Sequence, residues 1–200
     1  MVMKPEPLAA AVKERRDSSG QARVVLLSPQ GRRYNQSVAT ELARQSHLIL
    51  VCGRYEGVDE RFRTSYVDDE ISIGDFILTG GELAAMVIID SVTRLLPGVL
   101  GCSDSADKDT FSRNLLKHPQ YTRPRMFEKS QVPEELLSGN HENIQRYRFI
   151  TSVTRTIERR PDLIQTEQFS ENELQLLRQH DLLKTVKEIQ RSRKINDVSG

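Results

Sequence analysis

Residues 72–81 combine glycines with a short apolar run, and their types could bind a flat aromatic ligand. Glycine lets a ligand approach the backbone closely, and residues 76–78 are Phe-Ile-Leu between the glycines Gly74, Gly80 and Gly81. This pattern predicts an apolar wall against which a flat ring could pack. Main-chain N–H and C=O groups beside it could recognise the ligand through hydrogen bonds. An alternative stays open, in which the stretch is a strand, a turn and a helix start capped by Thr79 and Glu82.

Two further glycine loops follow strand-like segments. Residues 23–28 and 47–52 are unbroken apolar runs, which are typical of parallel strands covered on both faces. A turn at 28–31 follows the first run and a loop at 53–57 follows the second. Residues 68–70 read as an acidic bend, and 71–78 as a third extended piece. Ligands bind beyond the carboxyl ends of parallel strands, so we expect the three loops to meet there.

Helices are expected between these strands, at 5–16, 36–45, 59–66 and 82–96. The alternation of strands and helices predicts an α/β fold with a mostly parallel sheet. The helix at 82–96 is the most apolar, and we expect its core-facing stripe to be Leu83, Met86, Val87, Ile89, Val92 and Leu95.

The second half of the chain has a different character. Residues 102–112 read as a polar linker, and no further convincing strand follows. Helices are expected at 132–141, 141–160 and 171–190, with a frayed tail from 191 onward. The predicted domains are therefore an α/β domain at 1–101, a linker at 102–112 and a small helical domain at 113–200.

Composition narrows the class of protein. The chain has 200 residues and a net charge of only +1, so nucleic-acid binding requires a local basic patch. Two cysteines fifty residues apart predict neither a disulfide framework nor a metal site, and indicate a reducing, cytoplasmic compartment. No signal peptide, membrane-spanning run or lipidation motif is visible, so no membrane partner is expected.

Three segments form a recognisable set: 27–31 (Leu-Ser-Pro-Gln-Gly), 52–61 (Cys-Gly-Arg-Tyr-Glu-Gly-Val-Asp-Glu-Arg) and 72–83. Together they resemble the bacterial tRNA (guanine-N1)-methyltransferases, the TrmD family. The similarity continues through 90–94, 97–101, 121–124 and 137–141. The resemblance implies methyl transfer from S-adenosylmethionine to N1 of the guanosine at position 37 of tRNA. It also implies a deep trefoil knot that holds the cofactor, and a homodimer with its active sites at the subunit interface.

The family motifs also imply roles for individual residues. The cofactor site would comprise Leu27, Ser28, Pro29, Gly53, Tyr55, Glu56, Gly57, Ser72, Ile73, Gly74, Asp75, Phe76, Ile77, Leu78, Gly80 and Gly81. Asp109 would remove the N1 proton, and Arg94 would stabilise negative charge on O6. On local sequence alone, Asp104 and Asp107 are rivals of Asp109, and the family register selects Asp109. The nearby Asp59-Glu60-Arg61 cluster is either part of the site or ordinary surface charge.

The helix expected at 141–160 carries five arginines that we expect on one side, as contacts for the tRNA backbone. They are Arg146, Arg148, Arg155, Arg159 and Arg160. A solvated face without a partner is the alternative, because Glu142 and Glu158 lie nearby.

The family resemblance implies a further N-terminal segment ahead of Met1, so the first domain is expected to be truncated. A second hypothesis follows, in which the chain is a catalytically inactive RNA-binding protein of the same fold. A generic nucleotide-binding α/β enzyme is disfavoured, because the first strand is followed by neither G-x-G-x-x-G nor a P-loop lysine.

Overall fold

The computed structural model describes residues 1–19, 21–99, 110–111 and 113–196. The chain divides into two compact units, Met1–Ala106 and Asp107–Gly200, and each is described by itself.

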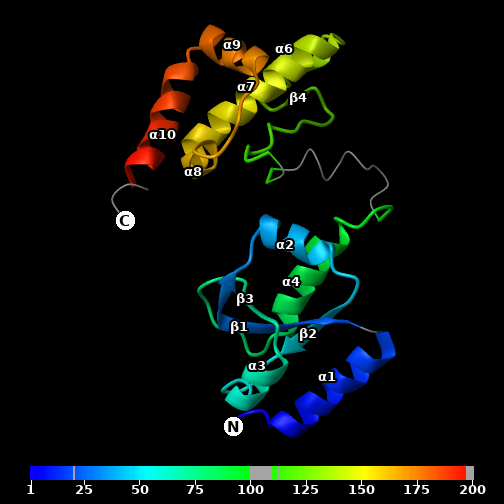
Figure 1. Cartoon of the computed structure of the whole chain (residues 1–200). Helices are drawn as coiled ribbons and strands as arrows, with labels where there is room; N and C mark the ends of the chain where they lie inside the picture. Colours follow the sequence, from blue (N-terminus) through cyan, green and yellow to red (C-terminus); the bar gives the residue numbers. More distant parts are fainter. Residues whose placement is uncertain (20, 100–109, 112, 197–200) are drawn as a thin grey trace. The chain divides into compact units, whose positions relative to one another are not determined.

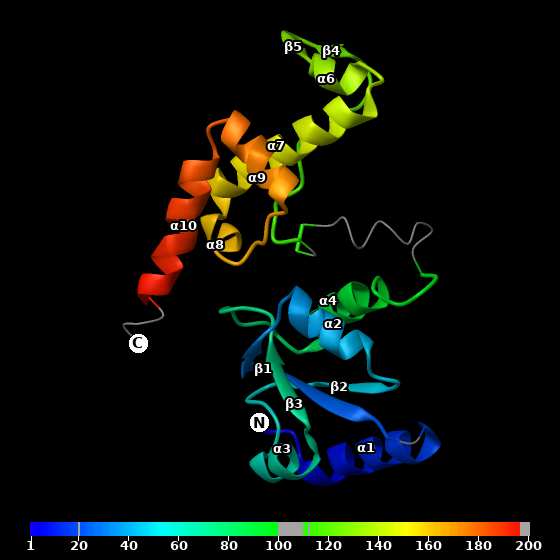
Figure 2. The same ribbon diagram turned by 45° about the horizontal axis from the view of Figure 1, so that its top comes forward.

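The first unit is built on a parallel sheet of β1 (Arg23–Arg33), β2 (Leu48–Cys52) and β3 (Asp69–Ser72). The strand order is β2-β1-β3, and both neighbours run parallel to β1 (Figures 1 and 2). Val24 and Val25 of β1 are completely buried, as expected of a central strand covered on both faces. The predicted α/β fold with a parallel sheet is confirmed.

Two helices cover each face of this sheet. The helices α2 (Gln36–Ala43) and α4 (Glu82–Thr93) lie on one face, and α1 (Pro5–Ser19) and α3 (Glu60–Tyr66) on the other (Figure 1). Alternate residues of β1 point to opposite faces, so Val25 joins the core under α2 and α4 while Val24 joins the core under α1 and α3. These packed layers hold the carboxyl ends of the strands in fixed register.

The core-facing stripe predicted for α4 is confirmed only in part, since Val92 is buried and Leu95 packs against the same core. Ala84, Ala85, Ile88 and Val92 are buried, whereas four residues of the predicted stripe are exposed: Leu83, Met86, Val87 and Ile89. The helix is apolar almost all round, so periodicity alone could not distinguish its two faces. Ala84 and Ala85 permit close packing of the helix, and Ile88 and Val92 fill the core beside them.

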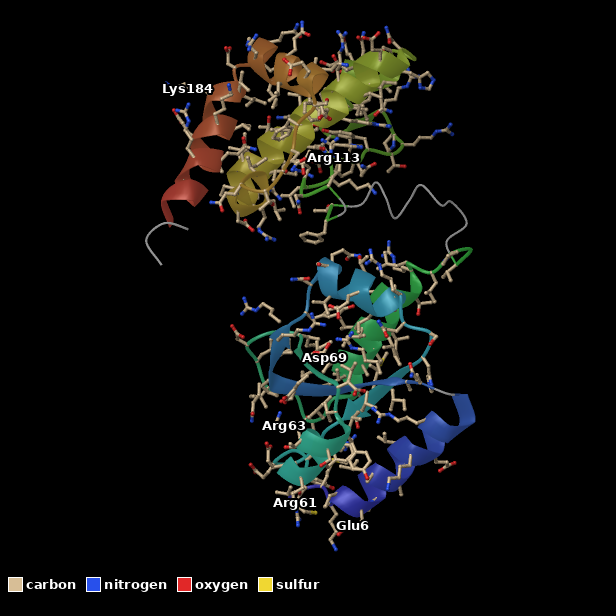
Figure 3. All side chains as sticks on the ribbon, in the orientation of Figure 1. Glu6, Arg61, Arg63, Asp69, Arg113 and Lys184 are labelled. Atoms are coloured by element: carbon tan, nitrogen blue, oxygen red, sulfur yellow. The ribbon has the colours of Figure 1, made fainter. Side chains whose placement is uncertain are left out.

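The start of β3 also differs from the prediction of an acidic bend, since Asp69 belongs to the strand. Its carboxylate accepts hydrogen bonds from Arg23 Nη2 at 2.8 Å and from Arg32 Nη2 at 2.7 Å (Figure 3). Burial pushes the pKa of Asp69 upward, but hydrogen bonds and charge from Arg32 and Arg23 outweigh it and lower the pKa below its usual range. Asp69 therefore joins the first residue of β1 to a residue near its end.

Asp59 has a structural role at the start of α3. Its side chain accepts a hydrogen bond from Arg61 N at 2.9 Å and forms an ion pair with the guanidinium of Arg61 at 2.8 Å. Asp59 is thus the N-cap of the helix. Glu60 likewise pairs with Arg63 one turn later, which favours the surface-charge interpretation of this cluster.

The hydrogen bond from Arg61 is the main cause that lowers the pKa of Asp59 from 3.8 to about 2. The charged form therefore stabilises the folded state above the unfolded pKa, and this stabilisation is lost as the pH falls from about 4 to about 2. We expect Asp59→Asn, which keeps the cap, to lower the melting temperature at pH 6 but not at pH 2. Thermal unfolding followed by circular dichroism between pH 2 and pH 6 tests this expected pH dependence. Arg61→Ala should show the same pH dependence, and a pH-independent difference would contradict the assignment.

The second unit is mainly helical, with α6 (Glu134–Leu137), α7 (His141–Arg159), α8 (Pro161–Ile164), α9 (Glu171–Gln179) and α10 (Leu183–Asn196). The predicted single helix at 171–190 is two helices, because the chain turns at Asp181, whose φ is +59°. The frayed tail was also predicted too early, since α10 continues to Asn196. Two short strands were missed, β4 (Met126–Phe127) and β5 (Ser130–Gln131), which pair antiparallel.

The core of this unit ties the segment before α7 to the helices. Leu115 packs with Val153 and Leu177, and Leu116 N donates a hydrogen bond to Thr156 Oγ1 at 2.8 Å. Arg113 bridges two carboxylates, Glu167 at 3.0 Å and Glu173 at 2.9 Å. Burial raises the pKa of Glu167 despite the opposing effect of Arg113. These contacts anchor residues 113–116 on the helical unit.

Candidate functional site

The three predicted loops leave the same edge of the sheet. Leu27 of β1 is in register with Cys52 of β2 and with Ile71 of β3, so the three segments that follow these residues begin at one level of the sheet. Gly53 lies directly beyond β2, and a Cβ placed on it would be 3.9 Å from Leu27 O. The expectation that the loops meet at the carboxyl ends of the strands is confirmed for the loops after β2 and β3, whereas residues 28–31 lie within β1.

The first loop forms part of β1 rather than a separate turn. Both Leu27 and Arg32 pair with Ile71, so residues 28–31 form an irregular excursion within the strand. Ser28 Oγ accepts a hydrogen bond from Gln30 N at 3.1 Å, which shapes the excursion locally. Leu27 is buried, Ser28 is half-buried and Pro29 is exposed. Residues 28–31 therefore border the candidate site, while β1 itself continues to Arg33.

The second loop, residues 53–57, is held by its own turn and by the N-terminal residues. Gly57 N donates to Arg54 O at 3.0 Å, and Gly57 has a φ of +100° that favours glycine. Met3 N donates to Gly57 O at 2.9 Å, and Glu56 N donates to Met1 O at 3.1 Å. The sequence interpretation missed this role of the first three residues, since their composition contains no signal for it.

The third loop, residues 73–81, contacts the second one directly. Gly81 N donates to Gly53 O at 3.0 Å, and a Cβ on Gly81 would lie 2.8 Å from the Cα of Cys52. Arg54 Nε donates to Glu82 Oε1 at 2.7 Å, which adds a side-chain link between the loops. The role of Arg54 was also missed, although it lies within the quoted 52–61 segment. Two of the three loops are therefore joined by both backbone and side chains.

The third loop also matches the expected apolar wall. Phe76 and Ile77 are 53% and 82% exposed, while Leu78 is half-buried against the core. Within the described part of the chain, the main-chain N–H and C=O groups of Ile77 and Leu78 make no hydrogen bond. Gly74 has a φ of +153°, and a Cβ there would clash with the ring of Phe76. The loop thus combines apolar surface with main-chain groups that a ligand could use.

Charges around these loops are largely paired. Arg33 forms an ion pair with Asp75, and the hydrogen bond from Arg54 lowers the pKa of Glu82. Burial, followed by the nearby charge of Glu82, raises the pKa of the Cys52 thiol, so Cys52 is favoured as a neutral thiol. The alternative capping box is wrong, because α4 begins after Gly81 and has no side-chain cap.

The two predicted catalytic residues cannot be placed as a pair. Arg94 is the exposed C-cap of α4, and its backbone N–H donates to Asp90 O at 3.2 Å. Asp109 lies outside the described residues, as do Gly101, Cys102 and the rivals Asp104 and Asp107. The pairing of Asp109 with Arg94 stays a prediction.

The five predicted RNA-binding arginines do not share one side of α7. Arg148, Arg155 and Arg159 recur at spacings of seven and four residues and lie on one face, but Arg146 lies on roughly the opposite face. Arg160 is the C-cap and is paired with Asp162, just as Arg146 is paired with Glu142.

The three arginines on the shared face have different environments. Arg148 has a buried Nε with no hydrogen-bond partner among the described residues. Arg155 Nη1 donates to Lys117 O at 3.4 Å, and Arg159 is exposed. The shared face therefore carries three of the five arginines that the sequence assigned to it.

Comparison with known proteins supports the resemblance seen in the motifs. Residues 1–166 match the family described as tRNA (Guanine-1)-methyltransferase TrmD. A tRNA (guanine-N(1)-)-methyltransferase of Moorella thermoacetica is 60% identical over 166 residues, which is 82% of this chain and 66% of that protein. Proteins of the same name from Geotalea uraniireducens and Halalkalibacterium halodurans are 54% and 56% identical, each over 88% of this chain and 72% of the relative. The chain thus spans roughly two thirds of the length of these relatives.

In the part that the structure describes, no helix is long and apolar enough to span a membrane.

Proposed function

This chain belongs to the tRNA (guanine-N1)-methyltransferase family, TrmD, and on that premise we propose that it methylates N1 of guanosine 37 in tRNA. The observation that carries the proposal is the match over residues 1–166, which includes all three loops at the sheet edge. No observation on the described residues favours the inactive RNA-binding alternative, and the relatives are named as methyltransferases.

S-adenosylmethionine is the proposed methyl donor, and when bound it supplies an activated methyl group. The residues at the three loops fit such a group. Phe76 and Ile77 offer apolar surface to an adenine ring, and the open main-chain groups of Ile77 and Leu78 can recognise its polar edge. Gly53 and Gly57 leave space beside the backbone, since a Cβ on either would meet nothing closer than 3.9 Å. The remaining residues predicted for this site are proposed to line it, and the chain here is proposed to form the trefoil knot.

Asp109 and Arg94 are proposed as the catalytic residues. N1 of guanine carries a proton that must be removed before methylation, and a carboxylate such as Asp109 can accept it. Loss of this proton places negative charge on O6, and the guanidinium of Arg94 can donate hydrogen bonds to that oxygen. The rest of the rate enhancement would come from holding the base in line with the donor.

A homodimer is proposed because α4 exposes a large apolar face. Leu83, Met86, Val87 and Ile89 are between 47% and 64% exposed. Contiguous apolar side chains on one helix mark a surface that is covered in the working protein. A second copy of the chain is the proposed occupant, and the helical unit at 113–200 is proposed to bind tRNA. The tRNA substrate would place the reaction in the cytoplasm.

The experiment is a calorimetric titration of S-adenosylmethionine into the purified chain, with its mass in solution measured alongside. We expect saturable binding to a dimer. Methyl transfer to a tRNA with guanosine at position 37, and none to the same tRNA with adenosine there, completes the test. Binding without methyl transfer would support the inactive alternative, and absence of cofactor binding would contradict the proposed site.

A further inference from the structure

The outer face of α10 carries a row of cationic side chains. Lys184, Lys187 and Arg191 are spaced by three and four residues, so they lie on one face of the helix. All three are exposed, and the side chain of Lys184 is 89% accessible (Figure 3). Val186 is completely buried, which directs the opposite side of the helix toward the core. The packing of α10 against the core therefore keeps these three cationic side chains on its solvent-exposed side.

These side chains line a groove between α9 and α10. Its other lining residues include Arg178 from α9, Leu183 at the start of α10, and two acids, Asp181 and Glu188. Lys184 Nζ lies 4.0 Å from Glu188 Oε1, so one cation is partly neutralised. Four cationic and two acidic side chains leave the groove with an excess of positive charge.

Most of the cations in the groove are available to a ligand. Among the described residues, Arg178, Lys187 and Arg191 have no ion-pair partner. On α7, by contrast, Arg146 and Arg160 are each paired with a carboxylate at 2.6 Å. The groove is therefore a further candidate for binding a polyanion, beside the three arginines on the shared face of α7.

We propose that the groove between α9 and α10 binds the sugar-phosphate backbone of tRNA, an inference that rests on the proposed function. Lysine and arginine bind phosphates mainly through charge, and each contact releases counterions from the nucleic acid. The half-buried Leu183 provides apolar surface along which the stems of long cationic side chains can pack. The groove would add affinity without reading base sequence.

The test is the salt dependence of tRNA binding by the Lys187→Gln/Arg191→Gln variant. Loss of two phosphate contacts should lower the slope of log affinity against log salt by roughly 1.4 to 1.8, and weaken binding severalfold. The control, Lys4→Gln/Arg44→Gln, removes the same charge from exposed sites of the first unit and should leave the slope unchanged. Affinity for S-adenosylmethionine should be the same in all three proteins.

A second variant gains affinity and so cannot be explained by misfolding. Asp181→Asn removes a negative charge from the groove, and asparagine tolerates the φ of +59° at this position. We expect it to bind tRNA about twice as tightly at low salt, because a repulsive charge is lost. If wild type binds and methylates tRNA but neither variant differs from it, the groove proposal alone is overturned. If wild type binds no tRNA, the proposed function and the groove proposal both fall.

Discussion

Replacement of Asp109 by asparagine is expected to reduce methyl transfer by roughly two to four orders of magnitude. The amide of asparagine matches the carboxylate in size, but it cannot accept the N1 proton of guanine. Affinity for S-adenosylmethionine should stay unchanged, because the proposed cofactor site is built from the three sheet-edge loops. Single-turnover methyl transfer to tRNA, with cofactor titration of the same preparation, measures both effects.

Two neighbouring acids provide matched controls for this experiment. Asp104→Asn and Asp107→Asn make the same chemical change in the same segment and should retain near-normal methyl transfer. A normal rate for the Asp109 variant, combined with a large loss for either control, would move the role of base to that neighbour. Equal losses in all three would indicate that the segment requires negative charge rather than one base.

Gly31→Ala is expected to lower the free energy of unfolding of the first unit by about 3 kcal/mol and to weaken cofactor binding. A Cβ on Gly31 would lie 2.5 Å from Glu70 O, and closer still to Ile71 N and to the carbonyl carbon of Glu70. These are backbone atoms of β3, so a side-chain rotation cannot relieve the clash. Separation of β1 from β3 would displace residues 28–31 at the edge of the proposed cofactor site. Urea unfolding followed by circular dichroism measures the change in stability.

Gly53→Ala is the matched control for stability. A Cβ on Gly53 would lie 3.9 Å from Leu27 O, which is an ordinary van der Waals distance. We expect this variant to unfold within about 0.5 kcal/mol of wild type. Equal destabilisation by the two substitutions would show that loss of glycine flexibility, rather than close approach of the strands, determines the effect.

Local sequence was sufficient to predict the layered α/β fold of the first unit. Unbroken apolar runs at β1 and β2 identified buried parallel strands, and glycines placed the loops that follow them. Local sequence did not predict the ends of elements that depend on contacts with adjacent strands. Asp69 reads as part of a polar bend, yet it enters β3 because Arg23 and Arg32 on the adjacent strand neutralise its charge.

The same distinction applies to the site. The motifs around Gly53 and Gly81 identified the family, because these motifs depend on residue type and order alone. Only the tertiary structure joined those loops through the hydrogen bond between Gly81 and Gly53 and the pair of Arg54 with Glu82.

For this protein, the sequence by itself determined the family and the strand-loop-helix order of the first unit, and it predicted the residues of the candidate cofactor site. The tertiary structure decided which face of α4 is buried and which basic residues remain unpaired. The physical reason is that burial and ion pairing depend on atoms brought together from distant parts of the chain. Neither the periodicity of one helix nor the charge of one side chain contains that information.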